Sequence, residues 1–135
     1  MYVRRFDPAD EAAVIALWRR CGLIVPKNNA VRDIALKMAW QPDLFLVGEE
    51  YGRIVATVMA GYEGHRGWIN YLAVDPNGQR CGVGRVMMTA AEEALREVGC
   101  PKINLQVRTS NASVIAFYEH LGYSVDEVTS LGKRL

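Results

Sequence analysis

The stretch Asp75–Met88, DPNGQRCGVGRVMM, lies at the point where a strand pattern changes into a helix pattern. An apolar run, INYLAV, precedes it, and apolar residues at helical spacing follow it. Gly82 and Gly84 stand one residue apart, flanked by Arg80 and Arg85. Glycine lets the backbone approach a ligand closely, and a helix N-terminus carries unpaired N–H groups and partial positive charge. The stretch therefore predicts a phosphate seat at the start of a helix.

The predicted helix runs from Val83 to Val98, with an apolar stripe on one side and charged residues on the other. Gly99 and Pro101 end it. Strand patterns lie on both sides of this helix, at Gly67–Asp75 and Lys102–Arg108. Two strands joined through a helix are expected to be parallel neighbours with a right-handed crossover.

The residues upstream predict one strand, two helices and two further strands. Their ranges are Tyr2–Phe6, Pro8–Cys21, Asn29–Trp40, Asp43–Glu50 and Arg53–Glu63. The last two form a hairpin around Tyr51-Gly52, and with Gly67–Asp75 they make an antiparallel meander.

Downstream, Ser110 or Asn111 caps a helix that reaches Leu121, and Tyr123–Leu135 is expected to give one or two closing strands. The expected fold class is α/β (α+β), a mixed, mostly antiparallel central sheet with helices on both faces. We expect a single domain over residues 1–135.

Composition excludes several function classes. The 135 residues are 50% hydrophobic and 23% charged, with a net charge of +1, which is typical of a globular domain and does not favour nucleic-acid or membrane binding. The apolar runs are too short to cross a bilayer, and the N-terminus lacks the apolar segment of a signal peptide. Three cysteines, at spacings that match no zinc site, indicate reduced thiols and a cytoplasmic location.

Three phosphate motifs compete for the glycine loop. A dinucleotide fingerprint starting at Gly82 needs a third glycine where the chain has Met87. A P-loop starting at Gly78 needs a glycine where the chain has Val83, and no Lys-Ser/Thr pair follows. The remaining pattern, [QR]-x-x-G-x-[GA], fits Gln79–Gly84 throughout. A turn whose glycines only relieve backbone strain remains the structural alternative.

The Gln79–Gly84 pattern resembles the pyrophosphate signature of the GNAT superfamily of N-acetyltransferases. The segment NASVIAFYEHLGY, Asn111–Tyr123, is similar to that family's second signature. The expected element order also resembles the family's over nearly the whole chain. Within the family, Ala60–Gly67 and Ser130–Leu135 resemble a subgroup of small bacterial acetyltransferases. The resemblance implies a GNAT-like acyl-CoA N-acyltransferase fold and acetyl-CoA as co-substrate, with no metal.

The resemblance also implies the site residues. A bulge in the family's fourth strand separates that strand from the fifth, and the donor's pantetheine arm lies in the resulting slot. Pantetheine and pyrophosphate are expected to contact Leu72, Ala73, Val74, Gln79, Arg80, Cys81, Gly82, Val83, Gly84 and Arg85, with Asn111 bonding the cofactor's amide. A backbone N–H near Leu72 would stabilise the thioester oxygen, and Tyr118 would protonate the departing thiolate. A core aromatic role for Tyr118 and a capping role for Asn111 are the structural alternatives.

No general base is assigned. Some relatives carry a glutamate where this chain has Gln106 or Trp68, and neither side chain accepts a proton at neutral pH. Glu63, Glu119 and His65 are expected to have surface roles, and Cys81 is expected to fill space beside the pyrophosphate. His65 and His120 have no carboxylate cluster that would suggest a metal.

The leading hypothesis is therefore an N-acetyltransferase acting on a primary amine by direct attack on the thioester. A CoA-binding regulatory module without turnover is the alternative, and a longer acyl group or an alcohol acceptor is a third. The acceptor pocket is expected between the first two helices, Glu63–Gly67 and the closing strands, with Cys21–Asn29 on one side and a lining of mixed charge. An exposed edge strand near the C-terminus would allow two copies to pair.

Overall fold

A five-stranded mixed sheet in the order β1-β2-β3-β4-β5 organises the N-terminal part of the chain. Its strands are β1 (Tyr2–Arg5), β2 (Phe45–Glu50), β3 (Arg53–Tyr62), β4 (Gly67–Val74) and β5 (Ile103–Leu105). Strands β1 to β4 pair antiparallel, whereas β4 and β5 are parallel. The predicted mixed, mostly antiparallel sheet is confirmed.

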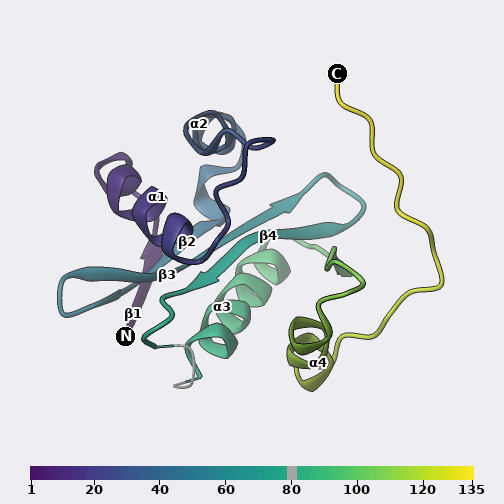
Figure 1. Cartoon of the computed structure of the whole chain (residues 1–135). Helices are drawn as coiled ribbons and strands as arrows, with labels where there is room; N and C mark the ends of the chain where they lie inside the picture. The colour runs from purple at the N-terminus through teal and green to yellow at the C-terminus, as the bar shows by residue number, and fades with distance from the viewer. Residues whose placement is uncertain (79–81) are drawn as a thin grey trace. The chain divides into compact units, whose positions relative to one another are not determined.

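The computed structural model describes residues 1–78 and 82–135. These residues form two compact units, Met1–Leu105 and Gln106–Leu135. The first unit also holds the helices α1 (Glu11–Arg20), α2 (Ala30–Ala39) and α3 (Val83–Glu97), and the 3₁₀ turns η1 (Pro8–Asp10) and η2 (Pro42–Leu44). Figure 1 shows α1 and α2 on one face of the sheet and α3 on the other, as the sequence predicts.

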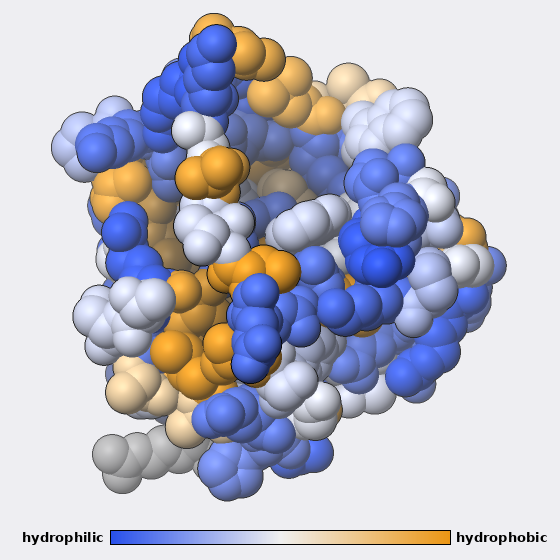
Figure 2. Space-filling view, turned by 90° about the vertical axis from the view of Figure 1, so that its right-hand side faces the viewer, coloured by the Kyte–Doolittle hydropathy of each residue, from blue (hydrophilic) through white to orange (hydrophobic). Residues whose placement is uncertain are grey.

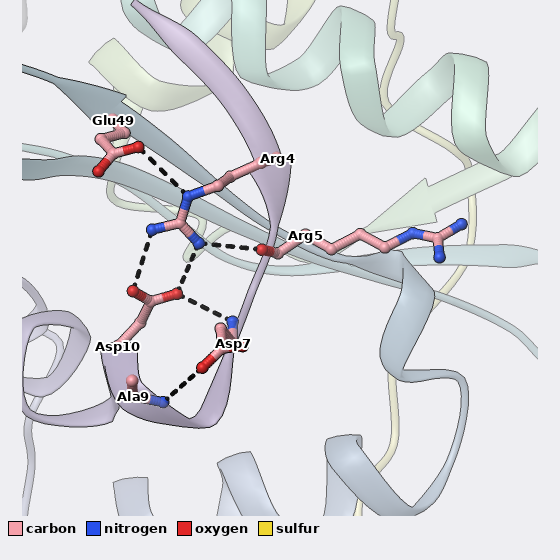
Figure 3. A network of polar contacts seen from close by, with 6 residues as sticks. All are labelled: Arg4, Arg5, Asp7, Ala9, Asp10 and Glu49. Carbon is pink, nitrogen blue, oxygen red and sulfur yellow. Dashed lines mark hydrogen bonds and ion pairs between the residues drawn. The ribbon is translucent and has the colours of Figure 1, made fainter. Parts of the chain in front are cut away.

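The start of α1 is fixed to the sheet by a polar network (Figure 3). Asp7 and Asp10 form a capping box, in which the Asp7 carboxylate accepts from Ala9 N–H at 2.9 Å and Asp10 accepts from Asp7 N–H at 2.9 Å. Asp10 also takes two hydrogen bonds from the Arg4 guanidinium, at 2.8 and 3.0 Å, and Glu49 takes a third at 3.3 Å. Strands β1 and β2 are thereby joined to the first helical turn.

The core under α1 and α2 is mainly aromatic and aliphatic. It contains Phe6, Val14, Leu17, Trp18, Ile34, Phe45, Val47, Met59 and Ala73. Phe45 stacks on Phe6 with ring centroids 4.4 Å apart, and Trp18 stacks on Tyr71 at 3.8 Å. The buried face of α3, which includes Met87, Ala91 and Leu95, forms the core on the other side of the sheet. On α1 the core follows the apolar stripe read from the sequence; on α3 the expected stripe included Val86 and Val98, which are exposed, whereas Met88 and Ala91 are buried.

The second unit contains α4 (Ala112–His120), which Asn111 caps by accepting from Val114 N–H at 3.4 Å. The strands expected over Tyr123–Leu135 are absent, because these residues are described without any strand or helix after the turn that ends α4. Val125, Val128 and Leu131 are exposed, and their spacing is not the strict alternation that gives a strand a buried face. The edge strand expected to pair two copies is therefore missing from the described residues.

The molecular surface mixes hydrophilic and apolar residues, and the face drawn in Figure 2 shows separate apolar areas among mainly hydrophilic neighbours. Large apolar side chains that are more than half exposed include Tyr2, Leu36, Trp40 and Tyr51. Among the described residues, no helix has the length and apolar character needed to cross a membrane.

Candidate functional site

Strands β4 and β5 pair over only part of their length. Gly67, Trp68 and Ile69 lie opposite Ile103, Asn104 and Leu105, and β4 then continues to Val74 with no β5 residue opposite it. The β5-facing edge of β4 is thus unpaired with β5 from Asn70 onward. Such an edge can take up an extended ligand through main-chain hydrogen bonds. The predicted Leu72, Ala73 and Val74 lie on this part of β4.

A β-bulge lies where the two strands part. Thr57 of β3 is opposite Ala73 and Met59 is opposite Asn70, so β4 has one residue more than β3 between these pairs. Tyr71 lies in this bulge and has a φ of +51°, a left-handed conformation that is costly for a residue with a Cβ. The bulge expected from the family resemblance is confirmed at Tyr71-Leu72.

The turn after β4 is held by Asp75, whose side chain is buried. Its carboxylate accepts from Asn77 N–H at 3.0 Å and pairs with Arg20 at 2.9 Å. The hydrogen bond from Asn77, together with Arg20, keeps the pKa of Asp75 below its usual range. Gly78 N–H closes the turn on the Asp75 carbonyl at 2.8 Å. These contacts fix the direction in which the chain leaves the strand.

The described chain resumes at Gly82, which has φ +72° and is the N-cap of α3. Glycine offers no capping side chain, and the first turn of α3 has no acidic residue. The 15-residue helix therefore starts with N–H groups that can donate to an anion. The predicted Gly82, Val83, Gly84 and Arg85 lie at this start. The predicted Gln79, Arg80 and Cys81 lie outside the described residues.

Tyr118 and Asn111 lie in the second unit, on α4 and at its cap. The Tyr118 ring is 8% exposed and makes edge contacts with Phe117 and Tyr123, with centroids 5.1 and 5.6 Å apart. Burial raises the pKa of Tyr118 to about 12. The phenol therefore keeps its proton at neutral pH and can donate it.

Glu63 and Gln106, at two positions considered for a general base, are engaged in local hydrogen bonds. The Glu63 carboxylate accepts from the backbone N–H groups of Arg66 and His65, and these bonds lower its pKa. Gln106 donates to Ser130, and Trp68 is partly exposed on β4. Among the described residues, no group of three histidine, cysteine or acidic side chains can hold a metal.

A cavity of about 420 Å³ lies between α1 and the start of α2. The segment expected to line an acceptor pocket contributes Ile24, Pro26, Lys27, Asn28 and Asn29. The other lining residues include Arg19 and Arg32, and none is acidic. The expected mixed-charge lining is therefore not found in this cavity, whose charged groups are all cationic.

Sequence reasoning missed the residues that hold the bulge. Thr57 accepts from Trp18 Nε1 at 2.8 Å and donates to the Tyr71 carbonyl at 2.8 Å. The Tyr71 hydroxyl donates to Asp33 at 2.6 Å, which raises its pKa further beyond the effect of burial. A threonine in a strand and a tyrosine in INYLAV look ordinary, so no local signal marked this network.

A family model supplies the decisive comparison, because the Acetyltransferase (GNAT) family matches residues 12–123. The chain belongs to this family. The acetyltransferase is 46% identical over 135 residues to an acetyltransferase of Pectobacterium atrosepticum, covering 100% of this chain and 96% of that one. It is therefore an acyltransferase enzyme of the GNAT type, a family whose donor is acetyl-CoA.

Solved structures support the fold of the acetyltransferase. Ard1 from Thermoplasma volcanium superposes with a TM-score of 0.79 at 24% identity, covering 93% of this chain and 83% of that one. The PaiA N-acetyltransferase from Thermoplasma acidophilum, solved in complex with coenzyme A, gives 0.80 at 15% identity, covering 95% and 92%. Beyond Ile69, β4 of the acetyltransferase has no β5 residue opposite it, and Gly82 supplies no capping side chain to α3.

Proposed function

We propose that this acetyltransferase transfers the acetyl group of acetyl-CoA to a primary amine by direct attack of the amine on the thioester. One observation carries the proposal: Gly82, left-handed and without a capping side chain, opens a long helix from within the Gln79–Gly84 motif. Its first-turn N–H groups supply the donors and the partial positive charge that a diphosphate requires. Beyond Ile69, β4 has no β5 residue opposite it, which supports binding of the pantetheine arm along this strand.

The chemistry assigned to the chain has three parts. The amine nitrogen bonds to the carbonyl carbon, and the C–S bond breaks. The Leu72 N–H stabilises the negative charge on the carbonyl oxygen. Tyr118, which is protonated at neutral pH, gives its proton to the departing thiolate. The amine arrives neutral; the proton that its nitrogen loses on forming the amide passes to water, and the Tyr118 phenolate regains a proton from water.

The acceptor is proposed to carry an anionic group beside its amine. The cavity between α1 and α2 supports this, because Arg19, Lys27 and Arg32 line it and none of its described lining residues is acidic. The Arg32 position is next to Asp33, which bonds Tyr71 of the bulge. We further propose one acetyltransferase domain over residues 1–135, a cytoplasmic location, and membership of the subgroup of small bacterial acetyltransferases typified by YpeA.

Isothermal titration with acetyl-CoA tests the donor site, using two variants at one position. Asparagine and aspartate both tolerate the left-handed backbone of Gly82, but only aspartate adds a negative charge. We expect Gly82→Asp to weaken acetyl-CoA binding by about tenfold or more, and Gly82→Asn to weaken it much less. Absence of binding by the wild-type chain at millimolar acetyl-CoA would reject the proposal.

A thiol-release assay over a panel of amines tests turnover and acceptor class. The panel pairs each amine that carries a carboxylate or phosphate with its uncharged analogue. We expect saturable release that depends on Tyr118, with lower KM for the anionic member of each pair. Acetyl-CoA binding without release of thiol for any amine, peptide or alcohol would favour the regulatory-module alternative. Equal KM values within pairs would reject the anionic acceptor.

A further inference from the structure

The bulge in β4 is held from beneath by a buried hydrogen-bonded chain. Trp18 and Thr57 are both 0% exposed. The indole Nε1–H donates to the Thr57 hydroxyl at 2.8 Å, and that hydroxyl donates to the Tyr71 carbonyl at 2.8 Å. A hydroxyl has a single proton to donate, and the proton of Thr57 goes to the Tyr71 carbonyl while its oxygen accepts from Trp18.

Tyr71 needs such support, because its left-handed φ of +51° persists only where the surroundings enforce it. Two contacts hold its side chain: the ring stacks on Trp18 at 3.8 Å, and the hydroxyl bonds Asp33 at 2.6 Å. The bond from Thr57 adds the backbone carbonyl. Side chain and main chain are thus fixed from α1, α2 and β3 together.

The carbonyl matters because of the peptide group to which it belongs. The Tyr71 C=O and the Leu72 N–H lie in one planar trans unit and point in opposite directions. A hydrogen bond that holds the carbonyl toward Thr57 therefore holds the N–H pointing away from it. That N–H is the group assigned above to the thioester oxygen.

We propose that Thr57 and Trp18 are positioning residues for acetyl transfer, which fix the direction of the Leu72 N–H through the Tyr71 carbonyl. The inference rests on the proposed function. It also explains why position 57 holds threonine, since packing alone would accept valine equally well. Valine has nearly the shape of threonine and is at least as favourable in a buried strand. A hydroxyl in a fully buried position is costly unless both of its bonds are made, and here both are.

The experiment compares kcat with acetyl-CoA affinity in variants of Thr57. Thr57→Val keeps the volume and removes both bonds, whereas Thr57→Ser restores the hydroxyl. We expect Thr57→Val to lower kcat by about 10- to 100-fold, the range found when a donor to the transition state is misplaced. Its Kd for acetyl-CoA should stay within about threefold of wild type, because the start of α3 is untouched. Thr57→Ser should recover kcat to within about threefold of wild type.

Leu95→Ala is the matched control for stability. Leu95 is buried on α3, on the other face of the sheet from Thr57's hydroxyl partners. It should lower the midpoint of thermal unfolding without changing kcat at a temperature where the protein is folded. If Thr57→Val does not fold, Trp18→Phe takes its place, because it removes the indole donor but leaves the bond from Thr57 to Tyr71. We expect Trp18→Phe to lower kcat by about threefold to tenfold.

The outcomes separate this inference from the proposed function. A Thr57→Val enzyme with wild-type kcat, or one whose loss Thr57→Ser does not recover, overturns the positioning role and leaves the proposed function standing. A loss of kcat in Leu95→Ala equal to that in Thr57→Val also overturns it, since stability alone would then explain both. A wild-type chain that binds no acetyl-CoA overturns both.

Discussion

At the scale of single residues, Tyr118 and Tyr71 show how position decides what a phenol does. Both are partly or fully buried, and burial raises the pKa of each. Tyr71 is committed to Asp33 by a 2.6 Å hydrogen bond, so its proton is already engaged in structure. Tyr118 makes edge contacts with two aromatic rings of its own unit, and no carboxylate partner of its hydroxyl is described. Of the two, Tyr118 is therefore the one to which we assign the acid.

Replacing Tyr118 with phenylalanine keeps the ring contacts and removes the proton. We expect Tyr118→Phe to lower kcat by about 100-fold, in the range found for loss of a general acid, with little change in acetyl-CoA affinity. Because the pKa of Tyr118 is about 12, kcat of the wild type should show no alkaline decline below about pH 11. The measurement is kcat against pH for both enzymes. A decline near pH 9 that disappears in the variant would contradict the assigned pKa.

The residue scale also separates what the sequence could predict from what it could not. The helix start at Gly82 and the cap at Asn111 were predictable because helix caps are local patterns. Thr57 and Trp18 were not found, since their partnership joins residues that are 39 apart in the chain. The positive φ of Tyr71 is imposed by tertiary contacts and is opposed by the residue's own preference. A backbone conformation that tertiary contacts impose against a residue's own preference cannot be predicted from local sequence patterns.

At the scale of elements, the joint between β4 and β5 depends on the absence of a side chain at Gly67. A Cβ there would lie 2.7 Å from Cys100 Sγ and 3.3 Å from Leu95 Cδ1. Gly67 also donates to the Lys102 carbonyl at 2.8 Å, next to the start of β5. The short β5 register begins at this point. A change at Gly67 therefore acts where the two strands part.

We expect Gly67→Ala to lower the free energy of unfolding by about 1–3 kcal/mol, through overpacking against Cys100. The double variant Gly67→Ala with Cys100→Ala should recover most of that loss, since the sulfur is the nearest obstacle. Urea unfolding of the wild type, both single variants and the double variant measures the coupling between the sites. Additive effects would mean that the clash is relieved elsewhere.

The joint between β1, β2 and the start of α1 is electrostatic and gives a pH-dependent prediction. The bidentate bond from Arg4 holds the pKa of Asp10 below its ordinary value. A carboxylate whose pKa is lower in the folded state stabilises the protein above its unfolded pKa of about 4, and this contribution is lost as pH falls. Asp10→Asn should cost about 1–2 kcal/mol at pH 7.

Unfolding free energies measured from pH 7 down to pH 2 test this sign. The difference between wild type and Asp10→Asn should shrink as Asp10 of the folded wild type takes up its proton. Asp43→Asn is the control, because its pair with Arg5 is solvent-exposed and should contribute about 0–1 kcal/mol. A difference that stays constant with pH would show that the loss comes from packing and not from charge.

The order and type of the elements were largely predictable, because residues that favour turns and helix caps mark where the elements begin and end. Asp7-Pro8, Tyr51-Gly52 and Gly99 mark boundaries that the structure keeps, at η1, at the β2–β3 hairpin and after α3. The closing strands failed because Tyr123–Leu135 has apolar residues without a buried face to organise them. Strand β5 is shorter than expected because its register with β4 ends at Leu105.

At the scale of the whole molecule, the residues proposed to contact the donor are divided along the chain between the two compact units. Leu72–Val74 and Gly82–Arg85 belong to Met1–Leu105, whereas Asn111 and Tyr118 belong to Gln106–Leu135. A ligand that binds only the folded state stabilises every part of the chain that its binding requires. Donor binding therefore reports whether the two units act as the single domain proposed for residues 1–135.

Thermal unfolding measured by calorimetry in the presence of acetyl-CoA tests whether the two units act as one domain. At a donor concentration of about 100 times Kd, the stabilisation is about 2.7 kcal/mol, which corresponds to a rise in Tm of about 10 °C for a chain of this size. We expect one transition that moves as a whole, because Asn111 and Tyr118 must be in place for the donor to bind as proposed. Gly82→Asp should show the same transition with little or no rise, and Gly82→Asn should keep most of it. A donor-induced split, in which only part of the unfolding enthalpy moves to higher temperature, would show that the second unit contributes nothing to donor binding, and Tyr118 could then not serve as the acid.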